Sequence, residues 1–456
     1  MTLADTFLLL DTVETAGVIG TVSEIRGLTL LVDDLPCPVG AVVRVETRRG
    51  PDVTGEVVGF DDHRTIVMLM GFTSGLKRGD RVHLEHAAPI ARVGDDLLGR
   101  VVDGFGRPID EQGELRETIA RSIQPEPIDP LHRATIDQPL GTGVRAIDTV
   151  LTAGRGQRLG VFAGPGIGKS TLLGMMAKYT DADVSVVALI GERGREVRDF
   201  IENSLGDEGL QRSVVIAATG DEPAPMRVRA AMYACSVAEH FRDQGLDVVF
   251  LMDSVTRFCQ AQRQIGLAAG EPPATKGFPP SMFSMLLVLL ERSGRTDRGS
   301  ITGFYAILVE GDDLTEPVSD TCRGILDGHI VLSRELANRN HWPAIDVLES
   351  VSRVARSVTD ADHQAARGEI VRLLSLYAEV EDMVNIGAYA PGSNPDYDLA
   401  IAMRPAILEL LQQSPVDHVD FQTARSQLLE LAGQVERQRQ KTHRNAGTRS
   451  TQGAST

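Results

Sequence analysis

The stretch RLGVFAGPGIGKSTLLGMM, residues 158–176, decides how this chain folds. It begins with an apolar run, continues through a glycine-rich turn and ends in a segment with the composition of a helix. Residues 163–170, AGPGIGKS, fit the phosphate-binding loop pattern with Ala in the place of the first glycine. Glycines let backbone N–H groups turn toward phosphates, and a helix N-terminus adds a positive dipole end. The stretch therefore predicts a strand, a phosphate-binding loop and a helix, in that order.

Two side chains of this loop have predicted roles in nucleotide binding. Lys169 is expected to reach the β- and γ-phosphates of ATP, and the Ser170 hydroxyl is expected to bind Mg²⁺. The other residues predicted to bind the nucleotide at this loop are Ala163, Gly164, Pro165, Gly166, Ile167, Gly168 and Thr171. A chance glycine-rich turn is the alternative, which the order of strand, loop and helix disfavours.

A second metal ligand is expected at the end of the apolar run DVVFLMD, residues 247–253. A buried strand that ends in Asp is the usual water-bridged holder of Mg²⁺ in nucleotide sites of this kind. Asp253 is therefore the predicted partner of Ser170 at the metal. The alternative is that Asp253 only caps the next helix, because DSVTRF could begin one.

Hydrolysis also needs a group that orients water beside the terminal phosphate. In VVALIGERGREVRDF, residues 186–200, Glu192 follows another predicted strand and Arg193 stands next to it. Glu192 is the predicted general base, and Arg193 is predicted to hold the γ-phosphate. The alternative is a solvated cluster of charges, since more acidic and basic residues follow directly.

Composition limits the class of protein. The chain has 456 residues, a net charge of −17 and 42% hydrophobic residues, which is typical of a soluble protein of several domains. The acidic balance argues against binding nucleic acid over the whole surface. The four cysteines form no C-x-x-C pair, which indicates free thiols in a reducing compartment. No positively charged signal region precedes Arg26, and the apolar run MLLVLL is too short to cross a bilayer, so a cytoplasmic protein is predicted.

The pattern along the chain predicts an α/β protein of several parts. Short β-branched strands predict a β-barrel over residues 18–92. Apolar runs that alternate with helical stretches predict a mostly parallel sheet, buried on both faces, over 136–358. Between these parts, residues 93–135 are expected to form a linker, while 359–435 are expected to be helical and 436–456 a disordered basic tail.

Several long motifs in one order resemble the F-type/V-type ATPase superfamily, and more closely its type III export ATPases. They include GVRAIDTVLTAGRGQRLGVFAGPGIGKSTLL, IGERGREVRDFIE, LMDSVTRFCQAQRQIGLAAGEPPATKGFPPSMF and ILDGHIVLSRELANRNHWPAIDVLESVSRV. The resemblance covers roughly residues 18–435 and implies a β-barrel, a RecA-like ATPase domain and a helical domain. It also implies a homohexameric ring whose ATP hydrolysis energises protein export.

The segment HWPAIDVLESVSRVARS, residues 341–357, holds the only tryptophan of the chain. The resemblance implies that Trp342, which stands where the family usually has Tyr, packs on the adenine of its own site. It implies that Arg353 reaches into the nucleotide site of the neighbouring subunit as an arginine finger. The alternatives are a core aromatic for Trp342 and an intersubunit ion pair without catalytic effect for Arg353.

The resemblance also implies partners. Residues 1–17 would dock a regulatory dimer similar to a stator stalk, and the Pro-rich loop AAGEPPATKGFPPSMF around Lys276 and Phe278 would grip a central stalk protein. For this loop the alternative is an ordered surface loop. An export gate, chaperone–substrate complexes and peripheral association with an export apparatus at the inner membrane are expected as well; nucleic acid is not.

Four functions compete. Flagellar export comes first, because EPPATKGFPPS is more typical of that branch, and an injectisome ATPase comes second. A rotary ATP synthase catalytic subunit would open its phosphate loop with Gly rather than Ala163. It would also carry an acidic signature in its C-terminal helices, which this chain lacks. A Rho-like RNA translocase would need exposed aromatics and basic residues near its N-terminus, where this chain has few aromatics and many acids.

Overall fold

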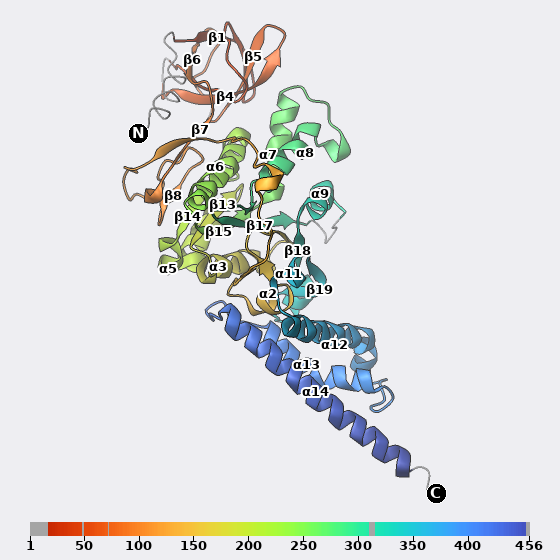
Figure 1. Cartoon of the computed structure of the whole chain (residues 1–456). Coiled ribbons are helices and arrows are strands. Elements are labelled where there is room, and N and C mark those ends of the chain that lie inside the picture. Colours follow the sequence, from red (N-terminus) through yellow and green to blue (C-terminus); the bar gives the residue numbers. More distant parts are fainter. Residues whose placement is uncertain (1–16, 48–49, 72, 310–314, 453–456) are drawn as a thin grey trace.

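The chain is divided along its length into a barrel, a sheet with helices on both faces, and a group of helices (Figure 1). The structure is a computed structural model that describes residues 17–47, 50–71, 73–309 and 315–452. The predicted α/β fold, with an N-terminal β-barrel, a central mostly parallel sheet and a C-terminal helical domain, is confirmed. Apart from Gly17, the predicted docking segment of residues 1–17 lies outside the described residues.

The barrel is closed by six antiparallel strands in the order β1-β2-β5-β4-β3-β6. Small residues allow this closure: a Cβ atom added at Gly55 would lie 2.6 Å from a methyl group of Val67 on the paired strand. Val43, Val57 and Val82 are among the side chains that fill the interior. The six strands are β1 (Ile19–Arg26), β2 (Thr29–Asp33), β3 (Val42–Val45), β4 (Val53–Asp61), β5 (Arg64–Leu69) and β6 (Arg81–His86).

The stretch expected as a linker, residues 93–135, contains regular structure. Here β7 (Ile90–Val93) pairs with β9 (Ile119–Ser122), and β8 (Val101–Val102) joins the edge of the central sheet beside β14. A largely buried ion pair between Arg100 and Asp110, at 2.8 Å, fixes the segment around β8. These pairings join residues far apart in sequence, so the local Gly and Pro pattern does not reveal them. The shorter elements nearby are η1 (Asp95–Leu97), η2 (Pro130–His132), β10 (Pro139–Leu140) and β11 (Ala153–Gly154).

The central sheet has the strand order β19-β18-β12-β17-β15-β13-β14-β8. Its strands run parallel except β19, which pairs antiparallel with β18, and β16, which pairs antiparallel with β17 beside this path. Most residues of the inner strands are buried because helices cover both faces. The strands are β12 (Arg158–Ala163), β13 (Val184–Ile190), β14 (Ser213–Ala218), β15 (Asp247–Asp253), β16 (Gly294–Arg295), β17 (Ser300–Leu308), β18 (Gly328–Leu332) and β19 (Ile345–Ser352).

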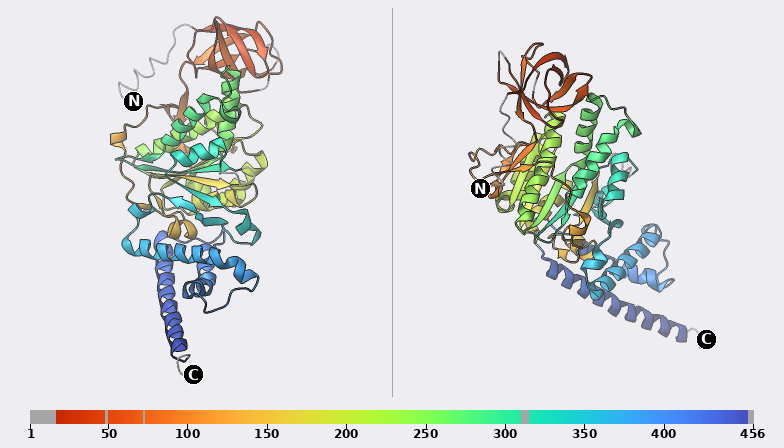
Figure 2. Two further views of the ribbon diagram at one scale, coloured as in Figure 1. Left: turned by 90° about the vertical axis from the view of Figure 1, so that its right-hand side faces the viewer. Right: turned by 45° about the horizontal axis from the view of Figure 1, so that its top comes forward.

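Two hydrophobic cores lie on opposite faces of this sheet (Figure 2). One core includes α2 (Arg145–Val150) and α3 (Lys169–Tyr179), and the C-terminal helices continue it. The other core is built by the long helices α6 (Ala224–Asp243), α7 (Val255–Ala268) and α8 (Pro280–Glu291). The remaining helices of the domain are α4 (Gly194–Asp199), η3 (Phe200–Leu205), α5 (Gly206–Gln211), η4 (Thr275–Gly277), α9 (Pro317–Ile325), α10 (Arg334–Asn338) and α11 (Ala355–Val358).

The C-terminal part consists of α12 (Ala361–Asn385), α13 (Pro395–Leu411) and α14 (Phe421–Gln452). α14 packs through an apolar stripe that includes Leu428, Leu431 and Val435. The structure differs from the expected disordered tail, because α14 extends beyond this stripe through Gln452. The Glu, Arg, Gln and Lys residues at 436–441, directly after Val435, have good helix propensity. Within the described ranges, no helix is long and apolar enough to cross a membrane.

Candidate functional site

The phosphate loop has the backbone that the sequence predicts. β12 ends at Ala163, and α3 begins at Lys169. Gly166 and Gly168 have φ values of +75° and +84°, a left-handed conformation that favours glycine. No described side chain caps the start of α3, so the first N–H groups of the helix are left for an anionic ligand. Ser170 and Thr171 lie exposed on this first turn.

Three predicted residues converge beside this loop. Asp253 ends β15 and Glu192 follows β13, its neighbour in the sheet, so both carboxylates lie at the carboxyl edge of the parallel strands. The Lys169 ammonium forms an ion pair with Asp253 and lies 3.7 Å from Oε1 of Glu192. The side chains of Asp253 and Glu192 are only 4% and 14% exposed. One ammonium is therefore the shared counter-charge of two largely buried carboxylates.

The pKa of Glu192 is strongly raised. Burial raises the pKa of its carboxyl to about 7, the nearby Asp253 carboxylate adds to the rise, and Lys169 opposes it. Its Oε1 atom is buried and has no hydrogen-bond partner among the described residues. A carboxyl with a pKa near neutrality and an oxygen atom that accepts no hydrogen bond suits a group that accepts a proton from water.

The structure does not bring Arg193 into the cluster. Its side chain is 86% exposed and lies 3.8 Å from Glu196 on the next turn of α4. A different arginine, Arg257 on α7, packs its carbon chain against Gly191, where a Cβ atom would approach it to 2.7 Å. The Arg257 Nε atom is buried without a hydrogen-bond partner in the described part of the chain. No motif in the sequence marked Arg257, although DSVTRF places it four residues after Asp253.

Trp342 lies against the phosphate loop of its own chain. A Cβ atom added at Gly168 would lie 2.9 Å from Cζ3 of the indole, and the side chain is 36% exposed. The indole Nε1–H donates a hydrogen bond of 3.0 Å to Oδ1 of Asn340. The hydrogen bond orients the ring beside the phosphate-binding loop, and the side chain remains partly accessible there.

A cavity of about 420 Å³ opens beside this tryptophan. Residues after α13 line it, and neither they nor their role were expected from the sequence, because about 70 residues separate them from Trp342. The lining residues are Arg145, Asn340, Trp342, Glu409, Gln412, Gln413, Ser414 and Asp417. The arrangement offers an aromatic face and polar groups next to the phosphate loop, as a nucleotide base requires.

Arg353 lies at the other edge of the sheet. It directly follows β19, which runs antiparallel to β18 and therefore ends where the parallel strands begin. There its backbone N–H donates to the Asp327 carbonyl at 3.0 Å, and its guanidinium donates to the Arg323 carbonyl at 3.1 Å. The eight residues of β19 span about 26 Å. Trp342 and Arg353 thus lie near opposite ends of the strands in one subunit.

Comparisons with known proteins agree with this architecture. The ATP synthase alpha/beta family, nucleotide-binding domain, matches residues 143–352. The beta-barrel domain of that family matches 22–84, and the T3SS EscN ATPase C-terminal domain matches 359–430.

Whole-length relatives decide the family. The chain is 50% identical over 416 residues to the flagellum-specific ATP synthase of Treponema pallidum, covering 91% of this chain and 93% of that protein. It is 48% identical over 402 residues to the type 3 secretion system ATPase of Xanthomonas euvesicatoria, covering 88% and 90%. The chain belongs to the family of flagellar and type III secretion ATPases. The resemblance drawn from its motifs is confirmed, and this ATPase is an enzyme of that class.

Solved structures show the same fold. The assembled ATPase EscN from the enteropathogenic E. coli type III secretion system has a TM-score of 0.85 at 43% identity, over 91% of this ATPase and all of that chain. EscN in complex with its central stalk EscO has a TM-score of 0.84 at 42% identity, with the same coverage of both chains.

Glu192→Gln is expected to remove a pH dependence of stability. The folded state raises the pKa of Glu192 from its ordinary value of 4.5 to about 7, so it binds the proton more tightly than the unfolded chain does. The stability that protonated Glu192 contributes is therefore fully present below about pH 4.5. It is lost as the pH rises through about 7, by at most about 1.4 kcal/mol per pH unit. Melting temperatures of the nucleotide-free ATPase at about pH 5 and about pH 8 measure this loss.

From the lower to the higher pH, the melting temperature of Glu192→Gln should rise relative to that of the wild type, because glutamine does not titrate. Glu202→Gln, a change at an exposed acid after α4, is the matched control and should parallel the wild type. An equal difference in melting temperature between Glu192→Gln and the wild type at both pH values would contradict the raised pKa of Glu192.

Trp342 should report the base directly, because it is the only tryptophan and lies beside Gly168. Its fluorescence is expected to change on addition of ADP, whereas pyrophosphate, which has no base, should change it less. Emission that stays identical with and without saturating ADP would contradict stacking on the base.

Proposed function

We propose that this ATPase acts as a subunit of a homohexameric ring and that its ATP hydrolysis energises type III export of flagellar proteins. The observation that carries the hydrolytic part is the convergence of Lys169, Glu192 and Asp253 beside the phosphate loop. The identity of 46–50% to flagellum-specific ATP synthases of Treponema pallidum and Bacillus subtilis favours flagellar export. An identity of 48% to a type 3 secretion system ATPase makes an injectisome the second candidate.

In this proposal Lys169 exchanges its carboxylate partners for the β- and γ-phosphates. The glycine-rich backbone and the free N–H groups of α3 bind the same phosphates, together with Thr171. Ser170 and Asp253 fit Mg²⁺, because a hydroxyl on the first turn of α3 and a carboxylate beside Lys169 supply the oxygen atoms that this ion prefers. When bound, Mg²⁺ would neutralise negative charge on the phosphates.

Glu192 orients the attacking water and accepts its proton. Its Oε1 atom, which accepts no hydrogen bond from the described residues, and its pKa of about 7 support this role, since both favour proton transfer near neutral pH. Arg193 stands next to Glu192 with an exposed, weakly paired side chain, and we propose that it turns toward the γ-phosphate when nucleotide binds. Trp342 packs on the adenine of the same site.

Arg353 completes the site of the neighbouring subunit. Within its own chain it lies at the edge of the sheet opposite Lys169, which supports action between subunits. A positive charge delivered to the γ-phosphate by an arginine finger accelerates such reactions by about 10³–10⁵.

A ring of this kind would work with protein partners. EscN, which this ATPase resembles, forms an assembled complex with a central stalk, and we propose a stalk protein for this ring as well. In the Pro-rich loop Lys276 is exposed, while Phe278 packs against Phe283 and lies under Arg263, so Lys276 is the better placed contact. A regulatory dimer at residues 1–17, an export gate, chaperone–substrate complexes and peripheral association with the inner membrane complete the proposal.

Lys169→Ala is expected to reduce ATP hydrolysis to background, because the phosphates lose their principal cation. The fold should persist, since Glu192 already binds a proton near neutrality and can remain neutral without Lys169. Phosphate release measures the activity, and Lys178→Ala at the other end of α3 is the matched control that should stay active. Turnover of Lys169→Ala at the wild-type rate would contradict the proposed site.

Mixed rings test the arginine finger. Arg353→Ala should bind nucleotide almost normally and lose hydrolysis, whereas Arg356→Ala, an exposed neighbour, should not. A Lys169→Ala chain still carries Arg353, and an Arg353→Ala chain still carries an intact site. Mixing the two should restore activity above that of either alone, because some intact sites then receive an arginine. Co-assembly without any restored activity would contradict action between subunits.

A further inference from the structure

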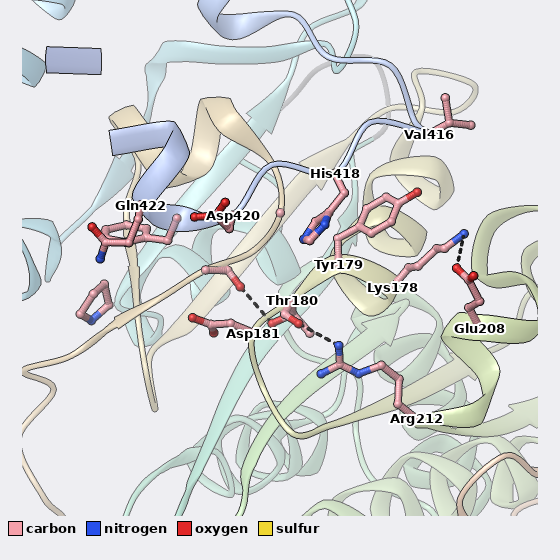
Figure 3. A pocket seen from close by; sticks show the side chains of 14 residues that line it. Lys178, Tyr179, Thr180, Asp181, Glu208, Arg212, Val416, His418, Asp420 and Gln422 are labelled. Carbon is pink, nitrogen blue, oxygen red and sulfur yellow. Dashed lines mark hydrogen bonds and ion pairs between the residues drawn. The ribbon is translucent and has the colours of Figure 1, made fainter. Parts of the chain in front are cut away.

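A cavity lies at the far end of the phosphate-loop helix, away from the phosphate loop (Figure 3). It has a volume of about 920 Å³ and is bordered by the C-terminal end of α3 and by the α13–α14 loop, residues 412–420. α3 begins with Lys169 and ends with Tyr179, so one helix of eleven residues connects the phosphates to this cavity.

An aromatic pair joins the two walls of the cavity. The rings of Tyr179 and His418 are stacked, with centroids 5.2 Å apart and planes inclined by 21° (Figure 3). On its other side Lys178, which pairs with Glu208 at 3.6 Å, places its ammonium 5.3 Å from the centre of the Tyr179 ring. His418 itself is exposed, so the stack is its principal attachment to α3.

The other end of the α13–α14 loop is attached to the base cavity through Gln413. This side chain is 5% exposed, and its Nε2 atom donates to the carbonyls of Gly143 and Asp417, both at 2.8 Å. Its Oε1 atom accepts from the backbone N–H of Arg145 at 2.8 Å. Its own backbone N–H donates to the Trp342 carbonyl at 2.9 Å. Gln413 therefore ties the loop to the residue that faces the base.

We infer that His418 is a positioning residue for the nucleotide base: by stacking on Tyr179 it holds the α13–α14 loop so that Gln413 and Trp342 keep their places. The inference rests on the proposed nucleotide site. The carbonyl of Asp417, bonded to Gln413, belongs to the residue directly before His418, so the two attachments are adjacent. A loop that is held in its binding conformation before the ligand arrives binds more tightly than one that must be ordered.

His418→Ala should weaken the binding of ADP without weakening the binding of pyrophosphate. Loss of one aromatic stack corresponds to a dissociation constant for ADP that is about threefold to tenfold higher. Pyrophosphate reaches only the phosphate loop, which the change leaves intact. Calorimetric titration of the full-length ATPase measures both ligands, and the nucleotide-free emission of Trp342 should also shift in this variant.

His418→Phe is the matched control, because it keeps an aromatic ring and should bind ADP like the wild type. Wild-type ADP affinity in His418→Ala would overturn the inference. An equal loss for ADP and pyrophosphate would overturn it too, as would a loss in His418→Phe as large as in His418→Ala. Failure of the wild-type chain to bind ADP would overturn the proposed function itself, which the other outcomes leave standing.

Discussion

Two buried carboxylates share one ammonium at the centre of this protein, and much of the fold serves that arrangement. Glu192 and Asp253 reach the same place because β13 and β15 are parallel neighbours and end at one edge of the sheet. Buried carboxylates so close together are costly unless a cation stands between them or one of them takes a proton. Lys169 supplies the cation from the helix that follows β12. Glu192 can take the proton, because its pKa is raised.

The direction of a single strand determines where Trp342 and Arg353 lie relative to each other. β19 begins just after Trp342, beside the phosphate loop, and ends just before Arg353 at the opposite edge. A parallel strand in this position would have reversed that order and placed the arginine at its own site. The antiparallel pairing of β18 and β19 is thus the feature that separates the proposed base contact of Trp342 from the proposed finger, Arg353.

Local patterns predicted most of the fold and the centre of the site. The phosphate loop, Asp253 and Glu192 all lie within a few residues of a strand end, so hydrophobic runs and glycines reveal them. His418 lies more than 200 residues from Tyr179, and Gln413 lies about 70 residues from Trp342, so no local pattern marks either residue. The pairing of β8 with β14 was not predicted for the same reason. The helical end of α14 was not predicted because a polar composition alone favours disorder as much as an extended helix.

The position of Arg353 has a consequence for a cell that makes this ATPase in excess of its export machines. If Arg353 acts on a neighbour, as proposed, a subunit alone would hold a nucleotide pocket but no complete catalytic site. An open row of subunits has one complete catalyst fewer than it has members, and only closure of the ring supplies the last. Free subunits would therefore keep their nucleotide intact, and consumption of ATP would begin where subunits gather, at the export machine itself.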